Sequence, residues 1–292
     1  MIRGSLIKST AIELLRLASI YLPNDVKESL KSAYNAERDE VARMQLKAIL
    51  NNISLAEEKN IPLCQDTGLH VFYADLGSVQ VEDFEDSINE AVSEATKTIP
   101  LRPNAVHPFS RKNSGTNLGQ HVPYINYKIS DQPFVEITVM PKGAGSENMS
   151  SLAMLTPTQG ISGVKEFILN CVMKAGGNPC PPNILGIGVG GSSDIAMKIA
   201  KEALLRPLND RNSDPEIAEL ETDILEAVNK LGIGPMGLGG DSTLLGVKVE
   251  LAHCHTATLP VALNYQCWAA RRASARIYES GNVEFLSHKL RK

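Results

Sequence analysis

Apolar positions in the first sixty residues follow the spacing of amphipathic helices. From Ile7 to Leu22 apolar residues recur at mixed intervals of three and four, and a second such pattern runs from Glu37 to Leu55. The apolar residues expected on one side of this second helix are Val41, Met44, Ala48 and Ile49. Pro62 then ends the helical region. The sequence therefore predicts a mainly helical segment over residues 1–60.

Beyond Pro62, strand and helix patterns alternate. We predict strands over residues 69–81, 122–129, 135–140, 184–189, 247–252 and 260–265, and helices over residues 84–98, 162–175, 194–205 and 215–231. The turn at residues 130–133 predicts that strands 122–129 and 135–140 pair with each other. Residues 101–122 are rich in Pro, Asn, Gly and Ser and predict a long loop, a feature that is often functional. The fold class is therefore α/β, with a helical N-terminal region followed by mixed strands and helices over residues 61–292.

Composition and charge limit the classes of function. With 292 residues, of which 43% are hydrophobic, the chain can bury a core as one large domain or two closely packed ones. A net charge of −4 gives no general attraction to phosphate backbones, so we expect no nucleic-acid partner. No apolar run reaches the roughly 18 to 20 residues that span a bilayer, and no secretion signal is evident. We therefore expect a cytoplasmic protein with no membrane partner.

Three of the five cysteines lie where predicted elements meet loops. An odd number of cysteines without a secretion signal argues against a disulfide framework, and the absence of any C-x-x-C pair disfavours local zinc or redox motifs. Cys64, Cys180 and Cys267 are far apart in the sequence, yet three loops can meet at one point. Three thiolates leave one position of a four-coordinate metal open, which a catalytic Lewis acid requires.

Other motifs carry competing interpretations. Residues 186–191 match G-x-G-x-x-G, but no acidic residue follows at the expected strand end, so close backbone packing competes with nucleotide binding. On a strand, His253 and His255 would share a face for zinc, with Cys254 on the other. The small residues of 142–146 suit carboxylate or phosphate binding through backbone N–H groups, or simply a tight turn.

Four separated segments together resemble a known family. IPLCQDTG, PKGAGSENMS, NPCPPNILGIGVGGSS and HTATLPVALNYQCWAARR are similar, in this order, to the α subunit or equivalent N-terminal domain of class I, iron–sulfur fumarate hydratases. The likeness runs from about residue 10 to the C-terminus. It implies a 4Fe–4S cluster held by Cys64, Cys180 and Cys267 in loops at element edges. Cys171 and Cys254 would then be ordinary thiols.

The resemblance also implies roles for other residues. Asp66 would be the general acid and His255 a second catalytic residue. Gln65, Arg102 and Gly145 would contact the substrate, and Arg111 in the same loop is an alternative to Arg102.

The implied reaction is the reversible hydration of fumarate to (S)-malate, a step of the tricarboxylic acid cycle, with the open iron as Lewis acid. Dehydration of tartrate or another hydroxydicarboxylate is the alternative within the same family, and a zinc- or nucleotide-binding module is a more remote one. Single-chain members carry a further domain that holds the base, and the chain shows no counterpart of it. The resemblance therefore implies a β subunit and an α2β2 heterotetramer.

Overall fold

The computed structural model describes residues 1–288 and has the mixed α/β content that the sequence predicts. The helices are α1 (Gly4–Ile20), α2 (Asn24–Ala36), α3 (Glu40–Lys59), α4 (Phe84–Thr98), α5 (Ala144–Glu147), α6 (Gly160–Ala175), α7 (Ser193–Ala203) and α8 (Pro215–Asn229). The strands are β1 (Leu69–Asp75), β2 (Tyr124–Lys128), β3 (Phe134–Lys142), β4 (Ser151–Leu155), β5 (Asn183–Gly190), β6 (Leu244–Ala252), β7 (Leu259–Gln266), β8 (Ala273–Tyr278) and β9 (Val283–Phe285).

The chain forms two compact units, each built from more than one segment. The first unit comprises residues 1–24, residues 52–143 and the chain from residue 271 onward, and the second comprises residues 25–51 and 144–270. The predicted change from helical to mixed structure at residue 60 lies within the first unit and coincides with none of the boundaries between the units.

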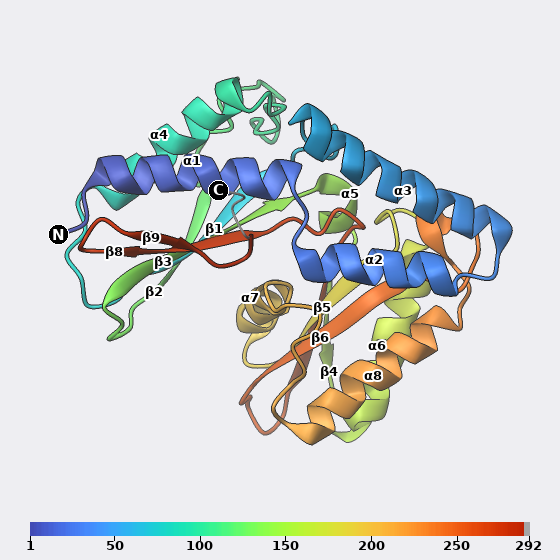
Figure 1. Cartoon of the computed structure of the whole chain (residues 1–292). Helices are drawn as coiled ribbons and strands as arrows, with labels where there is room; N and C mark the ends of the chain where they lie inside the picture. Colours follow the sequence, from blue (N-terminus) through green and yellow to red (C-terminus); the bar gives the residue numbers. More distant parts are fainter. Residues whose placement is uncertain (289–292) are drawn as a thin grey trace. The chain divides into compact units, whose positions relative to one another are not determined.

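The first unit is a five-stranded sheet with α1 and α4 on one face (Figure 1). The strand order is β2-β1-β3-β8-β9, with β2 parallel to β1 and the other neighbours antiparallel. The buried residues of α1 recur at helical spacing and include Ile7, Ala11 and Leu14. They pack with Phe72 and Ile137 of the sheet in one hydrophobic core.

The predicted pairing of residues 122–129 with residues 135–140 is wrong. Strand β1 lies between β2 and β3 and pairs with both of them. The side chains of β2 are mostly exposed, which suits an edge strand, whereas β1 buries alternate residues and takes a central place. Adjacency in sequence and a turn signal therefore do not decide which strands pair.

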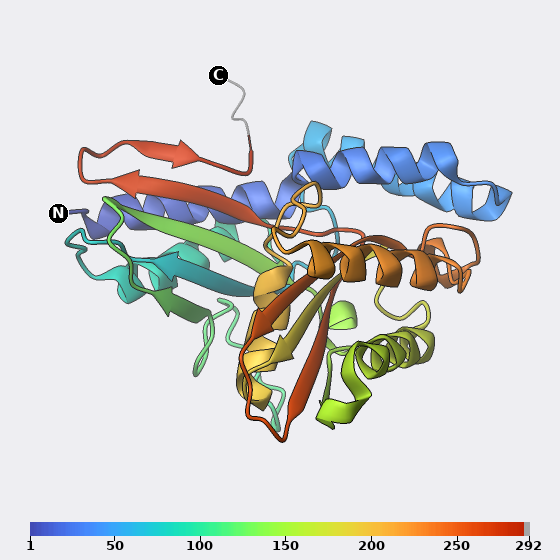
Figure 2. The same cartoon turned by 90° about the horizontal axis from the view of Figure 1, so that it is seen from below.

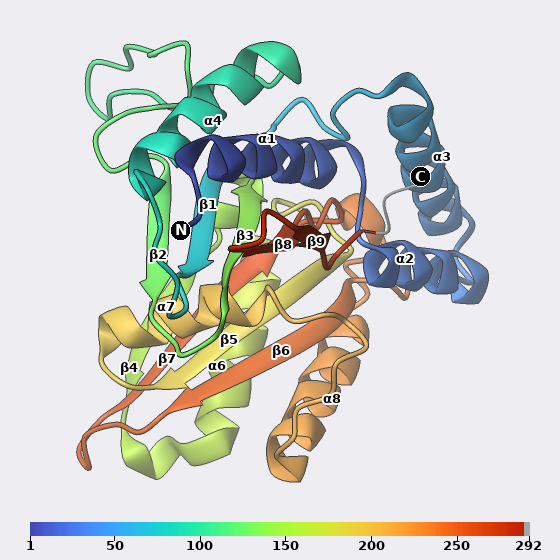
Figure 3. The ribbon, with the colours of Figure 1, turned by 60° about the vertical axis from the view of Figure 1, so that its left-hand side comes forward.

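The second unit is a four-stranded sheet covered on both faces (Figures 2 and 3). Its order is β4-β7-β5-β6, with β5 parallel to β6 and antiparallel to β7, and β4 antiparallel to β7. Helices α6 and α8 pack against one face with residues such as Ile168 and Ile224, and α7 covers the other with Ala196 and Ala200. Strand β5 is therefore buried on both faces, in keeping with its nearly continuous apolar run.

Helix α3 buries a face that shares only Ile49 with the one predicted. Val41 is 45% exposed and Met44 is 58% exposed. The residues of α3 that are buried are Ala42, Leu46, Ile49, Ile53 and Ala56. The helix carries two neighbouring apolar stripes. The buried one has apolar residues at regular three- and four-residue intervals along more of the helix. Within the described residues no helix is long and apolar enough to cross a membrane.

Candidate active site

The CQDTG loop of the first unit connects α3 to β1 and is held on both sides of Cys64. The Leu63 N–H donates to Ser19 O at 2.9 Å, and Asn52 Nδ2 donates to Leu63 O at 2.9 Å. After the cysteine, the Gly68 N–H donates to Asp66 Oδ1 at 2.9 Å and closes a tight turn. This turn leaves the Cys64 and Asp66 side chains half-buried.

The backbone conformation and the close packing at position 68 both require glycine. Its φ of +80° lies in the left-handed region, and a Cβ there would stand 2.7 Å from Lys142 N at the end of β3. The glycine therefore lets the CQDTG loop pass directly against Pro141 and Lys142 at the end of β3.

Hydrogen bonds join the long loop at residues 101–122 to this turn. Thr67 Oγ1 donates to Arg102 O at 3.1 Å, and Asn104 Nδ2 donates to Gly68 O at 3.1 Å. Arg102 is thereby held next to the CQDTG loop with an exposed side chain. The guanidinium of Arg111 instead turns back to Pro108 O at 3.4 Å. Of the two arginines, Arg102 is the one that the first unit places beside Asp66.

The second unit brings two of the predicted cluster ligands together. Cys180 precedes β5 and Cys267 follows β7, and the antiparallel pairing of these strands puts both at the same end of the sheet. The Trp268 N–H donates to Cys180 O at 3.1 Å, so the two loops are joined beside the thiols. Both cysteines are half-exposed. The loops of Cys180 and Cys267 therefore lie together in the second unit, whereas the expected meeting of all three cysteine loops stays a prediction.

One further residue that the sequence did not single out, Asn183, shapes this end of the sheet. Buried Asn183 donates through Nδ2 to Pro179 O at 2.8 Å and to Gln266 O at 3.2 Å, and so joins the loops before Cys180 and Cys267. An asparagine directly after a Pro-Pro pair was the available signal.

Gly145 lies beside the same loops. A Cβ at Gly145 would stand 3.2 Å from Asn178 O, so the K-G-A-G-S segment packs against the turn that precedes Cys180. The second unit therefore places three predicted site residues together: Gly145, Cys180 and Cys267.

His255 lies at the opposite end of β7 from Cys267. An eight-residue strand at about 3.3 Å per residue separates them by roughly 25 Å. Its ring Nδ1 accepts the Ala257 N–H at 3.1 Å, which leaves Nε2 as the protonated nitrogen of the neutral ring. His255 and Cys267 thus do not line one pocket within a single copy of this unit. The catalytic role of His255 stays a prediction, and it would require a second copy of the chain to bring the histidine to the cysteines.

Cys171, which is not a predicted ligand, differs from the predicted ligands in the environment of its thiol. Burial is the main cause of a raised pKa at Cys171, which packs against the second core. A buried thiol held in its protonated form is a poor metal ligand. Cys254 is exposed, and its thiol lies 3.2 Å from Thr258 O.

The glycine motif serves packing in this structure. Gly186 and Gly188 lie inside β5, where a Cβ would stand 2.1 Å from Ala200 O and from Ala196 O, respectively. The two glycines therefore let α7 lie against the sheet, which is the packing interpretation of the motif.

The predicted zinc motif is not on a strand. Strand β6 ends at Ala252, and His253 and His255 are exposed loop residues. The expected alternation of His253 and His255 on one face is therefore wrong. In the part of the chain that is described, no three His, Cys, Asp or Glu side chains are arranged as a metal site.

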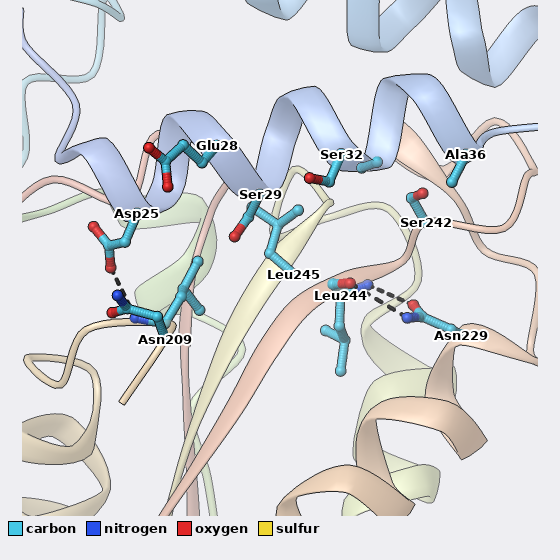
Figure 4. Close-up of a pocket in the computed structure, with 12 residues that line it drawn as sticks. Asp25, Glu28, Ser29, Ser32, Ala36, Asn209, Asn229, Ser242, Leu244 and Leu245 are labelled. Carbon is cyan, nitrogen blue, oxygen red and sulfur yellow. Dashed lines mark hydrogen bonds between the residues drawn. The ribbon is translucent and has the colours of Figure 1, made fainter. Parts of the chain in front are cut away.

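A separate cavity of about 530 Å³ lies between α2 and β6 in the second unit (Figure 4). Asp25 Oδ2 accepts the Leu208 N–H at 2.7 Å on one side, and Asn229 Oδ1 accepts the Leu244 N–H at 2.8 Å on the other. Its lining includes no residue of the predicted site.

Comparison with known proteins identifies close relatives. Residues 8–276 match the family model described as fumarate hydratase (Fumerase). A Methanocaldococcus jannaschii protein, provisionally named L(+)-tartrate dehydratase subunit alpha, is 50% identical over 277 residues, which cover 93% of this chain and 97% of the relative. The L(+)-tartrate dehydratase subunit alpha of Escherichia coli strain UTI89 is 36% identical over 275 residues, covering 93% and 91%. The protein of the same name from strain K12 is 35% identical over the same length.

Proposed function

Because the chain belongs to the fumarate hydratase family, we propose that it is the α subunit of a hydro-lyase that removes water from L(+)-tartrate. The observation that carries the substrate is the similarity, over 93% of the chain, to α subunits named for that reaction. Loss of water from a dihydroxy-dicarboxylate forms an enol, which rearranges to the 2-oxo acid. Because these relatives are named for tartrate, the hydration of fumarate becomes the second candidate for this chain.

Hydration of fumarate keeps support from two observations. The family model is described as fumarate hydratase. The loop at residues 142–148 reads K-G-A-G-S-E-N, which resembles the loop of the family's fumarate hydratases more than that of its tartrate dehydratases. Both reactions remove or add water at a carbon next to a carboxylate, so the same groups serve either substrate.

In this proposal a 4Fe–4S cluster is held by Cys64, Cys180 and Cys267. Two observations support this donor set: all five cysteines are free thiols, and the Trp268 N–H bond to Cys180 O joins the loops of Cys180 and Cys267. Cys64 stands at the held turn of the first unit and would be the third ligand. When bound, such a cluster supplies a Lewis acid for the departing hydroxyl group.

Asp66 is the proposed proton donor to that hydroxyl. Its Oδ1 accepts the Gly68 N–H, so we assign the transferred proton to Oδ2. Arg102 and Gln65 are exposed beside the turn, where a guanidinium and an amide would bind the carboxylates of a dianionic substrate. Gly145, next to the Cys180 loop, would let the substrate approach the backbone closely.

A β subunit would supply the remaining groups. The relatives are named alpha subunits, which implies a second polypeptide for each of them. We propose that this partner contributes the base that removes the carbon-bound proton and completes the substrate pocket in an α2β2 assembly.

The substrate is tested with the chain purified anaerobically together with its β subunit. We expect kcat/KM for L(+)-tartrate to exceed that for (S)-malate by about tenfold or more, the size of effect that one polar contact to the extra hydroxyl produces. A preference for malate would transfer the assignment to the fumarate reaction. Turnover of neither substrate would refute both.

Metal analysis of the same preparation tests the cluster. We expect iron and sulfide at roughly four each per chain. The cluster should be lost in Cys64→Ser, Cys180→Ser and Cys267→Ser but retained in the matched control Cys254→Ser. Stoichiometric zinc in a colourless protein would contradict the cluster.

A further inference from the structure

Arg271 is among the largest fully buried side chains of the chain, at 2% exposure, and lies in the first unit. Its Nη1 donates to the main-chain oxygen of Asp66 at 2.7 Å. The Nε of the same guanidinium is buried without a hydrogen-bond partner. A guanidinium is costly to bury, so its placement against the Asp66 main chain needs a physical reason.

The Asp66 carboxyl group and the Arg271 guanidinium converge on Gly143. A Cβ at Gly143 would stand 3.1 Å from Asp66 Oδ2 and 3.4 Å from Arg271 Nη2. The other carboxyl oxygen accepts the Gly68 N–H at 2.9 Å. The peptide of Asp66 is thus held by Arg271, while its two carboxyl oxygens lie against Gly68 and Gly143.

His70 is a buried titratable group that feels the charge of Arg271. Burial, followed by the Arg271 cation, lowers the pKa of His70 to about 4, so the ring is neutral at working pH. Neither ring nitrogen has a hydrogen-bond partner. The imidazole therefore adds no positive charge beside Arg271 at working pH.

We infer that Arg271 is a positioning residue for Asp66, which it orients through the Asp66 peptide. This inference rests on the proposed function, in which Asp66 Oδ2 delivers a proton. Fixing the peptide oxygen fixes the direction of the Asp66 side chain. A misplacement of about 1 Å in such a donor lowers a rate by about 100-fold. A lysine keeps the charge of Arg271 but loses the planar fork that reaches the Asp66 oxygen.

The test introduces Arg271→Lys into the anaerobic complex with its β subunit, alone and together with Asp66→Asn. We expect Arg271→Lys to lower kcat by about 10- to 100-fold with KM and iron content within about threefold of wild type. In the Asp66→Asn background the same substitution should lower kcat by less than about threefold, because two residues that act as a unit are not additive. Full additivity, or a loss confined to KM, would overturn the inference.

Gly143→Ala is the second variant, in case Arg271→Lys fails to fold. Gly143 is not in the left-handed region, so alanine is tolerated by the backbone, and its Cβ presses on Asp66 Oδ2. We expect the same kcat loss and the same non-additivity with Asp66→Asn. An unchanged kcat in this variant would count against the inference.

A readout independent of activity separates this inference from the proposed function. Hydrogen exchange of the peptide around Gly68 reports whether the turn closed by the Asp66 carboxylate opens. We expect about tenfold faster exchange there in Arg271→Lys, and no change in the control Arg276→Lys, whose guanidinium pairs with Glu136 on the same unit. Unaltered exchange in Arg271→Lys would overturn the positioning role even if the enzyme turned over neither substrate.

Discussion

The buried His70 should make the stability of the protein fall in mild acid. Its side chain lies fully inside the first unit, and burial together with the Arg271 cation lowers its pKa from 6.5 to about 4. In the unfolded chain the imidazole binds a proton as the pH falls through 6.5, whereas the folded chain binds it only near 4. The unfolded state therefore holds more protons in this window, and stability that is fully present above pH 6.5 is lost as the pH falls toward 4.

The size of the effect follows from the difference between the two pKa values. A shift from 6.5 to about 4 corresponds to about 3 kcal/mol at 1.36 kcal/mol per pKa unit. About 2.5 kcal/mol of this should be lost by about pH 4.5, where the folded ring has begun to titrate. For a protein with a total stability of about 5 to 15 kcal/mol this is a large fraction.

Urea unfolding from about pH 7.5 to about pH 4.5 measures the effect in wild type and in His70→Leu. Leucine cannot be protonated, so the variant should lose about 2.5 kcal/mol less than wild type over this range, whatever its stability at neutral pH. The control His121→Asn replaces an exposed histidine at a φ of +58° that asparagine tolerates, and it should keep the wild-type slope. Equal pH slopes for wild type and His70→Leu would refute the reasoning.

Three further substitutions test the packing around the two sheets by thermal unfolding. Gly68→Ala should destabilise by about 2 kcal/mol or more, since its Cβ would meet Lys142 N at 2.7 Å at a left-handed φ; an unchanged melting temperature would contradict this. Tyr265→Phe should leave stability unchanged or raise it by up to about 1 kcal/mol, because the buried hydroxyl has no partner, and a clear loss would show a missed contact. Glu221→Leu should cost about 1 to 3 kcal/mol, mainly because the buried Val249 N–H loses its acceptor while Arg206 keeps Asp210 and Glu250, and a neutral effect would rule that out.

Local sequence patterns determined much of the architecture of this protein. Helix α4 begins and ends where the pattern predicted, at Phe84 and Thr98, because its apolar period and early acidic residues are signals within the helix itself. The loop at residues 101–122 was likewise visible from its composition, and the structure ties it to the CQDTG turn. The motifs around the cysteines identified the family, since each motif is a short run of residues.

Only the tertiary structure decided which distant segments meet. The partner of β2, the buried face of α3 and the place of Arg271 beside Asp66 depend on contacts between residues far apart in the chain. Similarly, the resemblance assigns His255 and Cys267 to one site, whereas the intervening strand holds them at opposite ends. An extended strand keeps residues that are close in sequence far apart, and a folded core brings distant residues together. Periodicity and spacing alone therefore predict neither the separation nor the contact.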